Sequence, residues 1–328
     1  MSPNNFLVTG TLRSGTTLLQ RSLDACPGIR CQYQTATEIF ANVKRDFLSE
    51  QGLYPYHIFP PLFPAEPHPD LLTGFLMKRD FVQRFRARSP SGVIQGVKEV
   101  LVEEFIPYLL PFIKVVLIIR DPRDVISSLH YGDFERYAGA RRPILFDLRN
   151  WRKSAGLAIY ARRHPRFLLL RYEDLVSKFE STIAEVSRFL GGETPDSELI
   201  RADLERPNSS FDHGVSGIFK NSVNHYRQIL PPDLERYIEQ LCYPEMKALG
   251  YNSEISIAEW MDNRHYIPKN PFAIHRPEFK EFNINKEHQK EKIRHGMIQD
   301  VKSSDTRAIR RNYIYPEIYN TLYQALRK

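Results

Sequence analysis

The chain has 328 residues, of which 42% are hydrophobic and 26% are charged, as is ordinary for a soluble globular protein. Its three cysteines are too few and too scattered for a disulfide framework, and no run of about 18 apolar residues predicts a transmembrane helix. The formal net charge of +7 suits an anionic ligand, nucleic acid or a membrane surface, and it equally suits a merely solvated basic face. Because the first five residues hold no apolar signal core, we expect a cytoplasmic protein.

The first predicted unit is a strand, a loop and a helix. Phe6 to Thr9 form a short apolar run, and a glycine-bearing loop comes directly after it. Apolar residues then recur at helical spacing from Thr17 to Leu23, and Cys26-Pro27-Gly28 ends that helix.

Later runs repeat this alternation. Residues 114–119 are continuously apolar apart from Lys114, which is typical of a strand buried on both faces of a parallel sheet. Further strands are predicted at 92–97 and 166–171, and helices are predicted from Pro122 onward and over 173–190. Strands that alternate with helices predict an α/β fold with a mainly parallel sheet flanked by helices.

Two segments depart from the pattern. Residues 54–69 hold six prolines and several aromatic residues, which excludes regular structure and predicts a long loop that is either a lid or a spacer. Residues 252–328 are polar and charged, without strand-like runs, and 313–326 has the character of a closing helix. We therefore expect one domain over 1–251 and a mostly helical or irregular extension of unknown role over 252–328.

The loop after the first strand reads Gly10-Thr11-Leu12-Arg13-Ser14-Gly15-Thr16-Thr17. This is the spacing of the phosphate-binding pattern G-x-x-x-x-G-K-[ST], with Thr16 in place of the lysine. Glycines let the backbone wrap a phosphate, N–H groups at the helix start point at it, and the hydroxyls and Arg13 add donors. The missing lysine normally reaches the β- and γ-phosphates, so its absence argues against an ATPase or kinase.

The stretch from Arg13 to Leu19 resembles the 5′-phosphosulfate-binding loop of sulfotransferases, and Leu23 to Pro27 is similar to the residues just beyond that loop in the tyrosylprotein and carbohydrate-type branch. The resemblance implies a P-loop-type sheet and a donor, 3′-phosphoadenosine 5′-phosphosulfate (PAPS). It implies that Arg13, Ser14, Gly15, Thr16 and Thr17 hold the donor, and that Arg13 helps to neutralise the leaving phosphate. It runs with interruptions from about Phe6 to Tyr251.

The segment from Ile118 to Ser128 resembles the 3′-phosphate-binding segment of the same family, which has an arginine at a strand end and a serine eight residues later. Arg120 and Ser128 match those positions. The rival interpretation makes Asp121 the magnesium-binding residue of a Walker B strand. Arg123 and Asp124 are expected to cap the helix or to pair locally.

Two further segments resemble parts of the donor site. Leu170 to Leu175 is similar to a strand-to-helix motif whose tyrosine lies near the adenine, so Tyr172 is the candidate; the alternative is an aromatic residue that fills the sheet edge. Ser216 to Lys220 resembles the late cofactor-binding segment, in which a basic residue often precedes an aromatic one. Here Lys220 instead follows Phe219, and it is the candidate for the 3′-phosphate.

The transfer itself needs cations around the sulfate and one base at the acceptor hydroxyl. Lys98 resembles the family lysine that contacts the transferring sulfate, with a surface lysine as the alternative. The catalytic histidine of the cytosolic branch falls on Val100, and the tyrosylprotein-type glutamate falls on Gln34, so neither is present. Glu38, in a Glu-x-x-Phe arrangement, is the expected base, and His57 is a reserve.

We therefore expect a sulfotransferase that moves a sulfuryl group from PAPS to a hydroxyl of a sugar, lipid, phenol or peptide, releases 3′-phosphoadenosine 5′-phosphate (PAP), and requires no metal. The alternatives are a P-loop kinase or NTPase and a non-catalytic nucleotide-binding relative. Nucleic acid is not an expected partner, because the arginines are scattered.

Overall fold

The computed structural model describes residues 5–50, 69–78, 93–132, 143–193, 220–262, 284–300 and 302–327. The chain forms two compact units. The first comprises Met1–Leu53, Pro69–Arg120 and Ala161–Val223, and the second comprises Tyr54–His68, Asp121–Tyr160 and Asn224–Lys328. The domain boundary expected at residue 251 stays a prediction, and the second unit contains residues from both sides of it.

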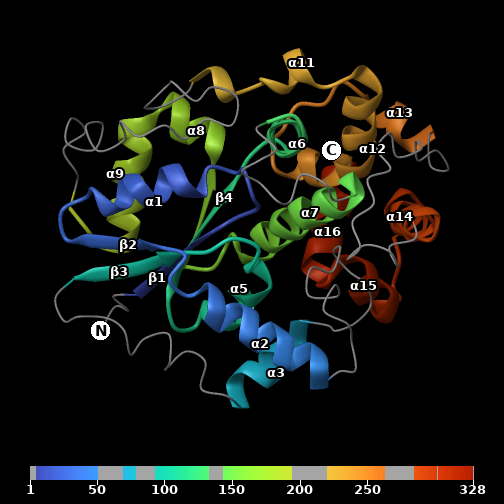
Figure 1. Cartoon of the computed structure of the whole chain (residues 1–328). Coiled ribbons are helices and arrows are strands. Elements are labelled where there is room, and N and C mark those ends of the chain that lie inside the picture. The colour runs from blue at the N-terminus through green and yellow to red at the C-terminus, as the bar shows by residue number, and fades with distance from the viewer. Residues whose placement is uncertain are drawn as a thin grey trace. The chain divides into compact units, whose positions relative to one another are not determined.

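The first unit is built on a sheet that has five strands within the described residues, all of them parallel. The strands are β1 Asn5–Thr9, β2 Ile29–Tyr33, β3 Ile94–Lys98, β4 Lys114–Ile119 and β5 Phe167–Arg171. Their order is β2-β3-β1-β4-β5 (Figure 1). The predicted α/β fold with a parallel sheet is confirmed, and β2 is a strand that no sequence pattern predicted.

The helical segments of the first unit lie between β1 and β4 or follow β5. They are α1 Thr16–Asp24, α2 Thr37–Glu50, α3 Pro69–Lys78, η2 Glu103–Phe105, α5 Ile106–Leu109, α8 Tyr172–Ser177, α9 Phe179–Leu190 and η4 Lys220–Ser222. The helix predicted over 173–190 is thus two helices, because Lys178 between them leaves helical backbone angles at φ −127° and ψ 46°. Gly191 ends α9 in a left-handed conformation with a φ of 97°.

Apolar side chains bury both faces of the central strands. On one face, Phe6, Val8, Val116 and Ile118 pack in one core cluster with residues of α1, α8 and α9, which lie together over the sheet in Figure 1. The alternate residues of the same strands, Leu7, Val115 and Leu117 among them, are also fully buried. The continuous apolar run at 114–119 therefore forms a strand that is covered on both sides, as predicted.

The second unit is helical in its described residues. Its helices are α6 Pro122–His130, α7 Ile144–Ala161 (all but its last residue), α11 Tyr226–Ile229, α12 Pro232–Ala248, α13 Ile257–Asp262, α14 Ile284–Gln299, α15 Thr306–Tyr313 and α16 Pro316–Ala325. Trp260, Tyr313, Tyr319 and Leu322 are fully buried in one cluster with residues of α7 and α12. The closing helix expected over 313–326 is α16, and Tyr313 instead ends α15.

Buried ion pairs hold α14 within the second unit. Glu291 on α14 accepts hydrogen bonds from Arg149 Nε and Arg152 Nη1, both at 2.5 Å, and Arg294 pairs with Glu245 of α12. Burial alone would raise the pKa of Glu291, but the charges of Arg152 and Arg149 hold it well below its usual value. Part of the polar composition of this segment therefore forms buried ion pairs, while Lys286 and Lys290 of α14 are exposed.

Candidate active site

The candidate residues gather where the parallel strands end. The register places Tyr33 of β2 beside Lys98 of β3 and Lys98 beside Val8 of β1, so these strands end at one edge. The loop at 10–17 comes after β1, Arg120 after β4, and Tyr172 after β5. The carboxyl edge of an α/β sheet is where such folds bind ligands.

The loop between β1 and α1 requires glycine at two positions. A Cβ atom on Gly10 would lie 2.3 Å from the carbonyl oxygen of Ile118. Gly15 is the N-cap of α1 with a left-handed φ of 96°, and a Cβ atom there would lie 2.3 Å from Cδ2 of Tyr172. The loop thus runs against its neighbours more closely than a side chain would allow, as a loop that wraps a ligand must.

The start of α1 offers N–H groups to an anion. The first helical hydrogen bond runs from Leu19 N to Gly15 O at 3.1 Å, so the preceding N–H groups of Thr16, Thr17 and Leu18 have no acceptor within the helix. Such a helix start binds phosphate or sulfate groups. Ser14 is buried, and its hydroxyl donates to Thr11 O at 2.7 Å, which closes the loop. Thr16 is buried and Thr17 is half-buried.

Arg120 and Tyr172 support the loop from the neighbouring strands. The Arg120 guanidinium donates to the carbonyl oxygens of Arg13 at 3.2 Å and Ser222 at 2.5 Å, and it stacks 4.5 Å from the centre of the Tyr172 ring. The Tyr172 hydroxyl shares a hydrogen bond of 2.7 Å with Ser222 Oγ. The structure therefore brings Arg13, Gly15, Arg120 and Tyr172 together in the first unit.

Lys98 is a buried cation at the end of β3. Only 3% of it is exposed, and its ammonium group lies 4.1 Å from the centre of the Tyr33 ring. Burial lowers the pKa of Lys98 from 10.5 to about 8, although the neighbouring Glu99 opposes this shift. The alternative that Lys98 is a surface lysine is wrong.

Glu38 and Glu99 are two glutamates in contrasting surroundings. Glu38 is exposed in the first turn of α2. Glu99 is 1% exposed and accepts hydrogen bonds from Ala36 N at 2.8 Å and Thr37 Oγ1 at 2.7 Å. Burial raises the pKa of Glu99, and these hydrogen bonds oppose the rise. A carboxylate of this kind is a structural acceptor, whereas Glu38 is open to a substrate.

The other expected residues belong to the second unit or lie outside the described residues. Ser128 is buried on α6 in the second unit. Lys220 begins η4, but its side chain lies outside the described residues, as do His57 and the segments 54–68 and 216–219.

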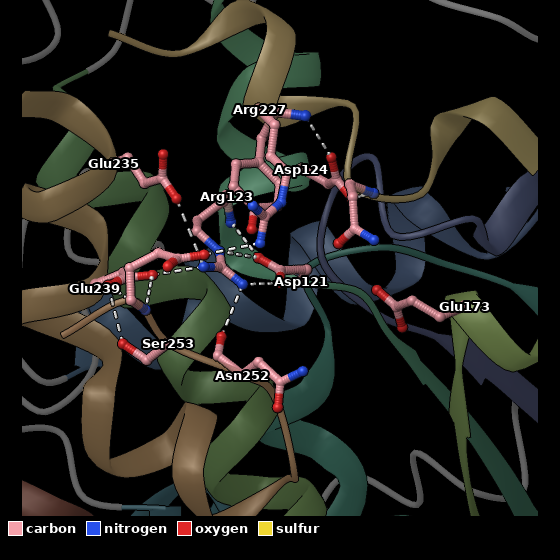
Figure 2. Close-up of polar contacts among 12 residues, drawn as sticks. Asp121, Arg123, Asp124, Glu173, Arg227, Glu235, Glu239, Asn252 and Ser253 are labelled. Atoms are coloured by element: carbon pink, nitrogen blue, oxygen red, sulfur yellow. Dashed lines mark hydrogen bonds and ion pairs between the residues drawn. The ribbon is translucent and has the colours of Figure 1, made fainter. Parts of the chain in front are cut away.

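Both carboxylate oxygens of Asp121 accept hydrogen bonds from Arg123, whereas a magnesium-binding carboxylate must leave an oxygen open to the ion. Its carboxylate caps α6 by accepting from Arg123 N at 2.9 Å, and it also accepts from Arg123 Nε at 3.0 Å and Nη2 at 2.7 Å (Figure 2). The same guanidinium bonds Glu239 of α12, and Asp124 accepts from the backbone of Asn224 and Tyr226. Arg123 and Asp124 therefore hold the second unit together, and Asp121 does not fit the Walker B interpretation.

Three contributors to the cluster in the first unit were not predicted from the sequence: Tyr33, Glu99 and Ser222. Glu99 and Tyr33 were findable in principle, because one comes directly after Lys98 and the other ends a strand at the same edge. No sequence pattern indicates Ser222, because its contacts with Arg120 and Tyr172 depend on how η4 packs.

The described residues hold no group of three or more His, Cys, Asp or Glu side chains that could bind a metal ion. In the same part of the chain, every helix is too short or too polar to cross a membrane. The cysteines Cys26, Cys31 and Cys242 are all buried and free of disulfides, as expected.

Comparisons with known proteins agree on one family. The sequence pattern of the sulfotransferase family matches residues 5–196. Carbohydrate sulfotransferase 3 of Tetronarce californica is 29% identical over 158 residues, which cover 42% of this chain and 36% of that protein. The match therefore spans about a third of the length of this curated relative.

Among solved structures, the sulfotransferase domain from the curacin biosynthetic pathway is 14% identical, with a TM-score of 0.47 and coverage of 76% of this chain and 99% of that one. Retinol dehydratase in complex with androsterone and the inactive cofactor PAP is 19% identical, with a TM-score of 0.41 and coverage of 78% and 83%.

Proposed function

The chain belongs to the sulfotransferase family, and we propose that it moves the sulfuryl group of PAPS to a hydroxyl group of an acceptor. The observation that carries this proposal is the loop between β1 and α1. It has two glycines that admit no Cβ atom, a row of helix N–H groups without acceptors in the helix, and buried Thr16 where a nucleoside triphosphatase has lysine.

The residues of the first unit supply the donor side of this reaction. The N–H groups of Thr16 and Thr17, with Arg13, would hold the 5′-phosphosulfate and neutralise the charge that develops on the leaving phosphate. Lys98 would donate to the sulfate oxygens. Burial lowers the pKa of Lys98 although Glu99 opposes the shift, and the negative charge of a bound phosphosulfate would raise this pKa again.

In-line transfer forms a bond between the acceptor oxygen and sulfur and breaks the bond between sulfur and the bridging oxygen of the 5′-phosphate. The acceptor hydroxyl must lose its proton in this step. Glu38 is exposed at the same edge of the sheet, and we assign it as the base that takes this proton. The products are the sulfated acceptor and PAP.

The 3′-phosphate and adenine contacts of the donor are part of the proposal. Arg120 is a guanidinium at the end of β4 and would bind the 3′-phosphate, while Tyr172 beside it would border the adenine. For Ser128 and Lys220 the support is the sequence motif alone. A reducing compartment such as the cytoplasm is supported by three buried cysteines that form no disulfide.

The carbohydrate sulfotransferase among the relatives makes a sugar hydroxyl the first acceptor class to test. Lipid, phenol and peptide hydroxyls suit the same chemistry. The kinase alternative gains no support, because the loop lacks its lysine and Asp121 is held by Arg123.

Isothermal calorimetry with PAP and with magnesium–ATP tests the donor side. We expect tight binding of PAP and weak binding of ATP, and tight binding of ATP without binding of PAP would refute the proposal. In a transfer assay, Glu38→Gln should lower turnover about 10²- to 10⁴-fold, to a residual rate, while it leaves PAP affinity nearly intact. Unchanged turnover would remove Glu38 from the role of base.

A further inference from the structure

A buried carboxylate lies directly beneath the first turn of the helix that carries Glu38. We infer that Glu99 is a positioning residue for sulfuryl transfer, which fixes the start of α2 and thereby orients Glu38 toward the acceptor. The inference rests on the proposed function, because it gives Glu99 a task only if Glu38 is the base.

Glu99 joins β3 to α2 through both of its oxygens. Oε1 accepts from Ala36 N at 2.8 Å, and Oε2 accepts from the Thr37 hydroxyl at 2.7 Å. Ala36 and Thr37 immediately precede Glu38. A negative charge at a helix N-terminus also interacts favourably with the helix dipole. The carboxylate therefore acts on the residues adjacent to the base without itself reaching solvent.

The backbone beside these residues is bound to the same strand end. Gln34 N donates to Lys98 O at 3.0 Å, and Gln34 has a left-handed φ of 50° that a free turn would avoid. The turn that leads into α2 is thus held at Gln34, Ala36 and Thr37 by two consecutive residues of one segment, Lys98 and Glu99.

A second anchor one to two turns along α2 prevents the helix from rotating. Lys44 donates to Leu101 O at 2.6 Å and pairs with Glu104, and the Phe40 ring meets the Phe105 ring edge-on with centres 4.8 Å apart. These partners of α2, like Glu99, belong to residues 99–105. Because α2 is fixed at both points, Glu38 between them has a fixed place relative to Lys98.

The two glutamates consequently have different tasks. Glu99 is only 1% exposed and each of its oxygens already binds a donor of α2 or its preceding turn, so an acceptor hydroxyl does not reach it. Glu38 is exposed and able to do so. Displacement of a base by about 1 Å can lower the rate about 10²-fold. Removal of the Glu99 carboxylate should therefore lower kcat measurably.

The test begins with Glu99→Gln. The glutamine amide nitrogen is a donor, so it cannot accept one of the two hydrogen bonds that Ala36 N and the Thr37 hydroxyl donate to Glu99. We expect kcat to fall about 10- to 100-fold, while the Kd for PAP stays within about twofold. Asp24→Asn is the matched control, since Asp24 accepts a backbone hydrogen bond from Cys31 N at 3.0 Å in the same unit but lies at the far end of α1 from the loop. Its kcat should equal that of the wild type.

Substitutions of Thr37 test the same hydrogen bond without changing the buried Glu99, because Thr37 is exposed. Thr37→Val removes the hydroxyl bond to Glu99 and should lower kcat in the same direction, whereas Thr37→Ser keeps a hydroxyl and should restore most of it. If Glu99→Gln does not fold, this pair carries the test. Equal kcat in Thr37→Val and the wild type would overturn the inference.

A double-mutant cycle shows whether Glu99 acts through Glu38. In the Glu38→Gln background, Glu99→Gln should cause no further fall in kcat, because the group that it orients is gone. A further fall of the same size as in the wild type would overturn the inference while leaving the proposed function intact. Full turnover in Glu38→Gln would also overturn it, and absence of PAP binding in the wild type would instead refute the proposed function itself.

Discussion

Gly15→Ala is the substitution whose effect the structure determines most sharply. The Gly15 backbone has a φ of 96°, which costs an L-residue about 1–2 kcal/mol. The new Cβ atom would also lie 2.3 Å from Cδ2 and 2.8 Å from Cε2 of Tyr172. Tyr172 cannot retreat easily, because Arg120 covers its ring and Ser222 holds its hydroxyl.

Gly28→Ala separates the cost of the left-handed backbone from the cost of the close contact with Tyr172. Gly28 has a φ of 73°, but no atom lies within 4 Å of a Cβ atom placed there. Gly28→Ala should lower the free energy of unfolding by about 1–2 kcal/mol, the cost of a left-handed φ. In Gly15→Ala, overpacking against Tyr172 should lower it by about 1–3 kcal/mol more. Gly15→Ala should also lower PAP affinity at least tenfold, since the loop must move to relieve the contact.

Urea unfolding of both variants gives the difference in the free energy of unfolding, and calorimetry gives the Kd for PAP. Equal destabilisation in the two variants, together with wild-type PAP affinity in Gly15→Ala, would refute the reasoning. It would mean that the close contact with Tyr172 does not constrain the loop.

Three further predictions concern charge and helix stability. Burial lowers the pKa of Lys98 to about 8, so kcat/KM should fall as the pH rises through about 8, and Lys98→Arg, which stays charged, should shift that fall to higher pH. The unfolded chain keeps this proton up to about 10.5, so the folded protein should gain stability between pH 8 and 10.5, and Lys98→Met should lose that gain in unfolding measurements. Glu291→Gln should cost about 3–5 kcal/mol because it leaves two buried arginines underpaired, whereas Glu254→Gln, in an exposed pair with Arg227, should cost less than about 1 kcal/mol. The depressed pKa of Glu291 stabilises the fold above pH 4.5, and acid titration of Glu291→Gln should lack the wild-type loss below that pH. Gly74→Ala, in α3 with open space around it, should raise the unfolding free energy by about 0.5–1 kcal/mol, and no gain would show that α3 contributes little to folding.

The parts of the fold that sequence predicts best are those with a single strong pattern. Residues 114–119 are apolar throughout after Lys114, and β4 has the predicted bounds. The strand β2 was missed because it is an edge strand, in which Ile29 and Cys31 are buried while Arg30, Gln32 and Tyr33 are exposed. Two buried residues in five leave too weak an apolar signal.

The candidate site shows the same division. Arg13, Lys98, Arg120 and Tyr172 lie at or just beyond strand ends, so topology alone brings them to one edge, and motif spacing suffices to find them. Glu99 accepts from residues 36 and 37, which are more than 60 positions away in the chain, and no local pattern encodes that contact. For residues 252–328 the sequence predicts no role, because the pairing of Glu291 with Arg149 and Arg152 joins helices that are about 140 positions apart in the chain.

Transfer from a labelled donor tests the proposed reaction most directly. Protein is mixed with PAPS that carries a labelled sulfuryl group and with a panel of sugar, lipid, phenol and peptide hydroxyls, and labelled product and PAP are measured together. We predict label on at least one acceptor class, PAP released in equal amount, and a fall of about 10²- to 10⁴-fold in both rates in Glu38→Gln. PAP binding without label on any hydroxyl acceptor would contradict the proposed function.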